Sequence, residues 1–319
     1  MSSSTRIFLY GPLGLLALIV VLYSVYWRVQ ADTLAARLDR ANGGEVIPGI
    51  VFAFAAKSIT GYPFQLDVAL SGVTFAHQAP EGETAWQTEK LAVHTLSHRQ
   101  DQFTFEAAGL QSFARPPLPP GTAPRIVLAT PTLARGSATL AEGKLVRFDF
   151  DLRELQAKEA SQGADPKRSF TAGQAQLHLL SRANNTIDVA MQIDNARIGP
   201  GFAGGASEVR LPRIVLRAML TQADALDALK AGTMSAADAV AAWRARMGTI
   251  AVSDLTVDWP DAHADLKGDL SLDANNRLTG SLKGSGVRDG KNPGEFGLTF
   301  AGGDVRLTAS SAAPARPAP

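Results

Sequence analysis

Hydrophobic and polar residues alternate along most of the chain after residue 50. The clearest stretch is 64–71, where every second residue is apolar: Phe64, Leu66, Val68 and Leu70. The same period of two recurs at 102–106, 147–153, 186–194 and 266–300. Strict alternation is typical of strands with one dry and one wet face, as in antiparallel sheets. The pattern therefore predicts a mainly β fold, built from hairpins as an antiparallel meander.

Turn-forming residues separate the predicted strands. They occur at 61–63, 80–82, 141–143, 184–185 and 275–276, and the proline-rich stretch 115–124 predicts a loop. Asn275 and Asn276 tolerate the left-handed conformation that a tight turn requires, so they predict a hairpin. The apolar phase slips by one residue between 250 and 259, which indicates a bulge or a turn.

Two stretches in the body of the chain have helical features. Residues 221–231 and 235–247 are rich in alanine, and each is followed by a glycine. Ser235 and Asp238 have the spacing of a capping box, with Asp in place of Glu. We therefore expect a helical insert at 221–247, with Val240 and Trp243 on the face that packs against the sheet.

An uncharged apolar stretch occupies residues 7–27. About 20 apolar residues, rising 1.5 Å each, cross a hydrocarbon layer of about 30 Å, so the stretch is long enough to span a membrane. Tyr23, Tyr26 and Trp27 stand at its end, where interfacial aromatic residues are found. The alternative is a signal sequence cleaved near Ala31, and the length of the apolar stretch favours an uncleaved anchor.

The anchor divides the chain into regions. Because the segment before it is short and the body looks globular, we expect residues 1–6 in the cytoplasm and the C-terminal domain in the periplasm, with a single pass through the inner membrane. Residues 28–43 are expected to form a stalk helix that packs on its own domain, since Leu34 and Leu38 share one face. Residues 44–309 are expected to form a β-rich envelope domain, in one or two subdomains, before a disordered tail at 310–319.

Composition excludes several function classes. The chain has 31 Lys+Arg against 30 Asp+Glu, a net charge of +1, whereas nucleic-acid-binding proteins carry a basic excess, so we expect no nucleic-acid partner. It has no cysteine, which excludes disulfides, cysteine-ligated metals and a thiol nucleophile.

Few residues suggest catalytic or metal chemistry. His94 and His98 have a metal-ligand spacing only on a helix, and their context predicts a strand. Asp149 and Asp151 could pair as acids, but a solvated strand face with neighbouring arginines explains them better. No hydrolase elbow and no complete nucleotide-binding loop is present. We therefore expect no catalytic residue, no cofactor, no metal and no enzymatic activity.

Two stretches resemble a known family. Residues 61–66 read Gly-Tyr-Pro-Phe-Gln-Leu, and residues 255–282 combine leucine-bearing strands with an Asp-Trp pair and an Asn turn. Both are similar to motifs of a bacterial envelope family common in alphaproteobacteria, the domain of unknown function twenty-one twenty-five, although the end of the chain departs from its pattern. The motif residues, for which we expect a structural role, are Gly61, Tyr62, Pro63, Phe64, Leu66, Asp258 and Trp259.

The family is distantly similar to AsmA-type envelope proteins, whose long β-grooves are associated with lipid handling. That resemblance implies a curved sheet or groove and contact with lipid. Many one-faced strands with few helices also leave a dry face that must be covered or bind a ligand. We therefore expect a periplasmic protein that binds or handles lipid or another apolar envelope component, with an apolar ligand face on Phe64, Leu66, Val68 and Leu70. The alternative is a non-enzymatic envelope scaffold, whose protein partners the sequence does not identify.

Overall fold

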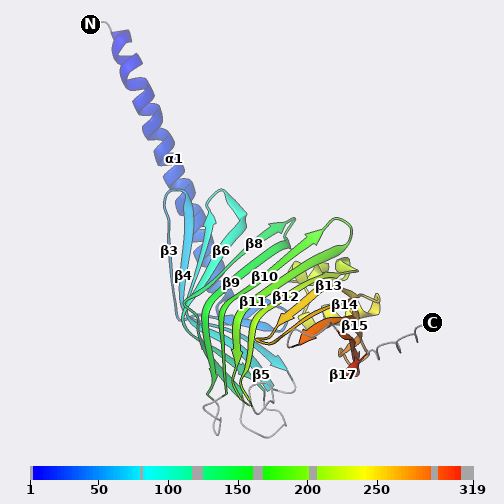
Figure 1. The fold of residues 1–319 in the computed structure, drawn as a ribbon. Coiled ribbons are helices and arrows are strands. Elements are labelled where there is room, and N and C mark those ends of the chain that lie inside the picture. The colour runs from blue at the N-terminus through cyan, green and yellow to red at the C-terminus, as the bar shows by residue number, and fades with distance from the viewer. Residues whose placement is uncertain are drawn as a thin grey trace, which may run out of the picture.

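The structure, a computed structural model, describes residues 3–79, 82–116, 125–160, 168–200, 207–288 and 294–309. In these residues one long helix leads into a curled sheet of seventeen strands with a short helical insert (Figure 1). All strand pairings are antiparallel. The predicted fold class, mainly antiparallel β with an N-terminal apolar helix and accessory helices, is confirmed.

The elements follow one another along the chain with short connections. The helices are α1 (Ser3–Ala41), η1 (Ala223–Leu226), α2 (Asp227–Lys230) and α3 (Ala236–Ala245). The first strands are β1 (Gly44–Ile47), β2 (Ile50–Ala53), β3 (Ala56–Thr60), β4 (Gln65–Ala79), β5 (Gly82–Leu96), β6 (Arg99–Arg115), β7 (Arg125–Thr130), β8 (Leu133–Ala141) and β9 (Lys144–Glu159). The later strands are β10 (Ser169–Arg182), β11 (Thr186–Ile198), β12 (Val209–Leu220), β13 (Ile250–Asp258), β14 (Ala262–Leu272), β15 (Leu278–Arg288), β16 (Gly294–Ala301) and β17 (Asp304–Ala309).

The strands cross the sheet in chain order, as a meander. From β9 to β17 each strand pairs with the next. Before β9, two pairs of short strands each behave as one interrupted strand: β2 and β3 both pair with β4, and β7 and β8 both lie between β6 and β9. The sheet curls so that β3 and β17 lie on opposite sides of the view in Figure 1.

The helix α1 has a free part and a docked part. Its N-terminal part extends away from the sheet, and its later part runs behind the strands (Figure 1). Apolar side chains of the free part are more than half exposed, such as Leu15 at 60% and Leu22 at 60%. Ala31, farther along, is only 6% exposed, and Leu34 and Leu38 pack against the sheet. The C-terminal half of α1 therefore covers part of the dry face.

The apolar character of α1 also fits a membrane. Among the described residues, its stretch Leu15–Ala41 is long and apolar enough to cross one, with a mean hydropathy of 1.4. A signal sequence near the N-terminus can also be long and apolar enough to meet this criterion. α1 is thus a candidate membrane span whose orientation its composition leaves open.

Two clusters of apolar side chains stabilise the sheet. The first lies on β2 to β9, and side chains of α1 pack against it; its buried members are Phe52, Val68, Leu70, Val73, Leu91, Ala107 and Ala134. The second lies on β12 to β16; its buried members are Ala218, Val252, Leu266, Leu270 and Leu282. Val68 and Leu70 of the first cluster, and Leu266, Leu270 and Leu282 of the second, come from alternating positions that the sequence pattern identifies.

The helical insert between β12 and β13 contacts the sheet at the ends of strands. Trp243 Nε1 donates to Thr221 O over 2.6 Å, and Arg244 donates to carbonyls of the β14–β15 turn. Ser235 caps α3 by accepting from Asp238 N over 3.1 Å, as predicted. The first predicted helix, 221–231, is instead a 3₁₀ turn and a single α-turn. Ala239, four residues before Trp243, takes the buried place predicted for Val240, because i and i+4 share a helix face.

The predicted turns and bulges that the structure describes are confirmed. Asn276 and Asn185 have positive φ, in the hairpins β14–β15 and β10–β11. The predicted slip in β13 is a register shift between Val252 and Leu255. Residues 80–81 of the predicted turn at 80–82, most of the predicted loop at 115–124 and the predicted disordered tail lie outside the described residues.

Candidate functional site

The turn at residues 61–64, the first part of the family motif, leads into β4. Gln65 N donates to Gly61 O over 2.9 Å and closes the turn. Gly61 has a φ of +100°, and a Cβ there would lie 2.7 Å from Asp67 Oδ2. A side chain at this position would be strained by the backbone and by the contact, so the turn favours glycine.

Aromatic side chains join this turn to α1. Trp27 packs edge-on against Tyr62, with ring centroids 5.6 Å apart, and the Tyr23 ring lies 6.0 Å from that of Phe64. Trp27 Nε1 also donates to Gln65 O over 2.7 Å. These contacts belong to what we call the aromatic collar: Tyr23, Tyr26, Trp27, Tyr62 and Phe64.

Ser97, in the turn between β5 and β6, ties the collar together. Tyr26 OH donates to Ser97 O over 3.1 Å, and Tyr23 OH lies 3.0 Å from Ser97 Oγ. Ser97 N and Oγ in turn donate to Phe64 O over 3.0 and 3.1 Å. Since Ser97 is only 1% exposed, these hydrogen bonds form in a closed contact.

The predicted ligand face on Phe64, Leu66, Val68 and Leu70 is not open. Leu66, Val68 and Leu70 are 0%, 5% and 4% exposed. Val68 and Leu70 pack in the cluster that α1 covers. Phe64 is 65% exposed, because it belongs to the turn before β4 and lies against α1 rather than on the dry face. The prediction of an open ligand face at these four residues is wrong.

The second part of the family motif closes a hairpin. Trp259 N donates to Ala262 O over 2.8 Å, in the turn between β13 and β14. His263 lies between two carboxylates: its Nδ1 contacts Asp258, and its Nε2 lies 2.8 Å from Asp265 Oδ2. The hydrogen bonds with Asp258 and then Asp265 raise the pKa of His263. The contacts of Asp258 and Trp259 are thus those of a hairpin end.

An apolar groove lies on the dry face, beyond the part that α1 covers. It has a volume of about 470 Å³, within the range of roughly 300–1,000 Å³ for small-molecule pockets. Phe105, Phe150 and Leu152 line it and also border the first apolar cluster. Eleven of its twelve lining residues are apolar; the twelve are Trp86, Phe105, Gln111, Phe113, Val127, Ala129, Pro131, Phe150, Leu152, Leu155, Ala157 and Phe170.

Irregular positions in two strands accompany the groove. Gly109 on β6 has a φ of +84°, and the β5–β6 pairing shifts between Thr88 and Lys90. Glu154 on β9 has a φ of +48°. Such irregularities bend a strand and increase its twist. Both lie where the sheet passes from the packed cluster to the groove.

A second apolar hollow, of about 390 Å³, adjoins the groove. Trp86 and Phe113 line both. Phe113 is 41% exposed, so apolar surface continues to the outside. Contiguous exposed apolar surface is typical of ligand or membrane contact sites.

Gln111 is the only polar residue among those that line the groove. It is 5% exposed, and its Oε1 accepts from Trp86 Nε1 over 3.1 Å. An indole N–H can only donate, so this contact fixes which end of the amide faces Trp86. The other end, Nε2, has no hydrogen-bond partner among the described residues. A buried donor without a partner costs about 1–3 kcal/mol.

Three arginines and a glutamate stand at the end of the groove. Arg125 Nε and Nη2 donate to the two Glu159 oxygens, each over 3.2 Å, and Arg168 Nη1 donates to Oε2 over 3.2 Å. The Glu159 side chain is 4% exposed, and the hydrogen bond from Arg125 holds the pKa of its carboxyl below the usual range. Arg115 lies directly opposite Arg125 in the β6–β7 pairing. We call these four residues the arginine cluster.

The arginine cluster shares the groove's face of the sheet. Residues two apart on a strand point to the same side. Glu159 follows Ala157 by two positions, and Arg115 follows Phe113 by two. Ala157 and Phe113 both line the groove. The groove therefore runs from an apolar middle to a basic end.

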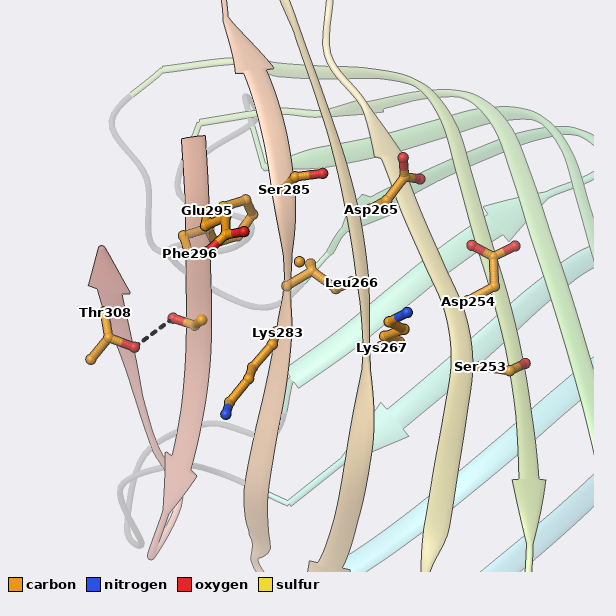
Figure 2. Close-up of a pocket in the computed structure, with 12 residues that line it drawn as sticks. Ser253, Asp254, Asp265, Leu266, Lys267, Lys283, Ser285, Glu295, Phe296 and Thr308 are labelled. Atoms are coloured by element: carbon orange, nitrogen blue, oxygen red, sulfur yellow. Dashed lines mark hydrogen bonds between the residues drawn. The ribbon is translucent and has the colours of Figure 1, made fainter. Parts of the chain in front are cut away.

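A larger and more polar hollow, of about 740 Å³, lies over β13 to β17 (Figure 2). Asp254 and Asp265 line it together with Lys267 and Lys283, so its charges have both signs. Asp265 already accepts a hydrogen bond from the Thr256 hydroxyl and lies against the imidazole of the hairpin. This arrangement is typical of a solvated strand face rather than of a site with one kind of charge.

The candidate acids Asp149 and Asp151 and the candidate ligand His94 also lie on the wet face, whereas His98 lies in the turn between β5 and β6. Arg147 Nε donates to Asp149 over 2.7 Å, and Arg153 Nε donates to Asp151 over 3.0 Å, which confirms a charged strand face there. His94 Nδ1 lies 2.7 Å from Asp67 Oδ1. In the part of the chain that the structure describes, no three His, Asp or Glu side chains are placed to hold a metal ion.

Sequence reasoning missed the groove although part of its signal was present. The alternation at 102–106 and 147–153 identifies the apolar sides of β6 and β9. Trp86 carries no such signal because it stands in a polar stretch, and Gln111 carries none because it is itself polar. The pairing of β6 and β9 through β7 and β8 brings these positions together, and a single sequence does not contain that pairing.

Comparison with known proteins identifies the family. The chain matches no curated protein and no solved structure. A family model, described as "Uncharacterized protein conserved in bacteria (DUF2125)", matches residues 27–285, which include the collar turn, the groove and the arginine cluster. The match ends before β16 and β17, where the sequence departs from the family pattern. The likeness to AsmA proteins and the alphaproteobacterial source stay predictions. The chain belongs to DUF2125, an uncharacterized family conserved in bacteria.

Proposed function

We propose that this protein is a non-enzymatic, membrane-anchored component of the bacterial cell envelope that binds lipid in the apolar groove. The observation that carries the proposal is the groove itself, in which eleven of twelve lining residues are apolar. Burying apolar surface releases about 25 cal/mol per Å². A hydrocarbon chain in the groove would therefore be favoured over water.

The character of α1 supports a position at a membrane. Its free part exposes apolar side chains, and the aromatic collar stands where this part ends. Tyr and Trp are enriched at membrane–water interfaces. We therefore propose that α1 is an uncleaved inner-membrane anchor. The collar then lies at the bilayer surface and the β-domain in the periplasm.

A non-enzymatic scaffold is the second candidate, and the edge of the sheet favours it. β17 pairs with β16, and its Val305 and Leu307 are 58% and 69% exposed. An exposed apolar edge strand can pair with a strand of another chain. Under this alternative the interacting surface would be the edge, and the groove would stay empty.

Lipid that co-purifies with the full chain tests the proposal. The chain is purified from membranes in mild detergent, and bound lipid is counted by native mass spectrometry. Phe113→Asp places a charge in the groove. Leu110→Asp is the matched control, because Leu110 lies on the same strand, is also 41% exposed and does not line the groove.

We expect lipid on the unchanged chain and on Leu110→Asp, and a loss of roughly tenfold or more on Phe113→Asp, since this change removes an aromatic ring from the lining and sets a carboxylate against the acyl chain. Circular dichroism of both variants shows whether the sheet is intact. Lipid-free protein, or equal lipid on the two variants, would exclude the groove as a lipid site. A protein partner lost on deletion of β17 would then support the scaffold.

A further inference from the structure

We propose that the ligand is a lipid with an anionic headgroup, whose headgroup binds the arginine cluster and whose ester carbonyl accepts from Gln111 Nε2. This inference rests on the proposed function, since it names the class of lipid that the same groove takes. Two independent features carry it: a net positive end of the groove and a buried donor without a partner.

The arginine cluster has more positive charge than its own carboxylate can neutralise. Arg115 and Arg125 are direct partners in the β6–β7 pairing, so their Cβ atoms lie about 4.5–5.5 Å apart, and like charges in such a pair are destabilising. Glu159 binds Arg125 and Arg168. Among the described residues, Arg115 has no ion-pair partner, and the cluster keeps two positive charges in excess.

The cluster is also accessible to a ligand. The side chains of Arg125 and Arg168 are 45% and 38% exposed. Each guanidinium has five N–H donors, of which Glu159 occupies two on Arg125 and one on Arg168. The planar guanidinium matches the oxygens of phosphate and carboxylate in a bidentate manner. A phosphate ester headgroup thus fits the free donors.

Gln111 adds a second recognition point inside the groove. Its Nε2 has no hydrogen-bond partner among the described residues, and the other residues that line the groove are apolar. An ester carbonyl near the top of an acyl chain is an acceptor of the required kind. Gln111 and Arg115 lie on one strand, four residues or about 13 Å apart. Because both side chains are long, one lipid headgroup with its ester linkage can bridge the distance between them.

The arginine cluster lies far from the aromatic collar. β6 runs from Arg99, next to the collar contact at Ser97, to Arg115 at the groove end. At about 3.3 Å per residue, this strand places the cluster roughly 50 Å from the collar. A lipid with its headgroup there lies outside the bilayer that holds α1.

Photoreactive lipids of identical acyl chains test the headgroup. The full chain in detergent micelles is offered phosphatidylglycerol, which is anionic, or phosphatidylcholine, which is zwitterionic, and crosslinks to the groove are counted by mass spectrometry. Arg115→Gln removes the unpaired charge. Arg99→Gln, at the other end of β6, is the control, since Arg99 is 56% exposed and lies away from the groove.

We expect phosphatidylglycerol to crosslink about tenfold more than phosphatidylcholine, because both lipids present a phosphate but the choline cation of phosphatidylcholine is repelled by the excess positive charge of the cluster. Arg115→Gln should remove most of this preference, and Arg99→Gln should leave it unchanged. Equal crosslinking by both lipids would overturn the inference and leave the proposed function standing. No crosslink from either lipid would overturn both. Binding of inorganic phosphate that Arg115→Gln abolishes, together with equal crosslinking by both lipids, would indicate an anion site without lipid.

The same preparation tests Gln111 with an ester-linked and an ether-linked phosphatidylglycerol, which differ in the carbonyl acceptor. We expect the ester form to bind several-fold more tightly to the unchanged chain, in proportion to about 1 kcal/mol per hydrogen bond. Gln111→Leu should bind both forms equally, because the donor is gone. Equal binding of the two forms by the unchanged chain would exclude the Gln111 contact. The ratio of ester-linked to ether-linked lipid bound by the unchanged chain is informative even if Gln111→Leu lowers stability.

Discussion

Trp27 is expected to hold α1 against the sheet. Replacing Trp27 removes the hydrogen bond from its Nε1 to Gln65 O, 2.7 Å long, and the edge-on contact with Tyr62 at 5.6 Å. A hydrogen bond contributes about 1 kcal/mol net, and an aromatic pair about 0.5–1.5 kcal/mol. Because Trp27 is partly exposed, we take the lower part of the sum of these two contributions. Loss of Trp27 should therefore weaken the docking of α1 by about 1.5–2 kcal/mol.

The chain itself offers an assay for undocking of α1. It has no cysteine, so a single introduced thiol reports on one position. Ala31 on α1 is 6% exposed, and the thiol of Ala31→Cys should react with a maleimide only when the helix lifts from the sheet. In this background we expect Trp27→Ala to speed labelling by roughly 10–30-fold. Trp27→Phe, which keeps a ring, should speed it by roughly fivefold.

Val29→Ala is the matched control, because Val29 lies two residues away on α1 and is 56% exposed. It should leave the labelling rate of the introduced thiol unchanged. Rapid labelling of that thiol in the otherwise unchanged chain would show that α1 is not docked. Equal effects of Trp27→Ala and Val29→Ala would refute the role of the collar.

Three further predictions concern stability of the β-domain. Gly61→Ala should destabilise by about 1–3 kcal/mol, since the backbone is left-handed and the Cβ would meet Asp67; Gly43→Ala, also at positive φ but with nothing within 4 Å, should cost less in denaturant unfolding. Glu159→Gln should lower the thermal midpoint at neutral pH; because the folded pKa is lowered, the advantage of the unchanged chain should shrink as pH falls below about 4.3. His263→Gln should act in the opposite sense: the folded pKa of His263 is raised, so the unchanged chain gains stability fully below about pH 6.5 and loses it as pH rises through the folded pKa, which parallel thermal scans would show.

Local sequence features predict much of the β-domain. The period of two identifies the dry faces, and glycine or asparagine at positive φ marks turns such as those at Gly143 and Asn276. Ser235 identifies the start of α3, because an N-cap hydrogen bond joins residues that are close in sequence. These features depend on neighbours within a few residues, and the sequence contains them directly.

The site depends on contacts between distant residues, which the sequence pattern does not specify. Leu66, Val68 and Leu70 alternate as strongly as any stretch, yet all three are buried, and Val68 and Leu70 pack in the cluster that α1 covers. Phe150, in an equally regular stretch, lines the open groove. Alternation shows that a face is dry and does not show what covers it. The register of β6, β7 and β9 decides that, together with the position at which α1 docks.

Crosslinking from inside the groove in living cells tests the central claim most directly. A photoreactive amino acid is introduced at Val127, which lines the groove, or at Leu128, the next residue of β7, which points to the opposite face. Both residues are partly exposed, so the two positions are matched. Lipid binding predicts lipid adducts at position 127 and few at position 128. Equal adducts at the two positions, or protein adducts alone at position 127, would contradict the account.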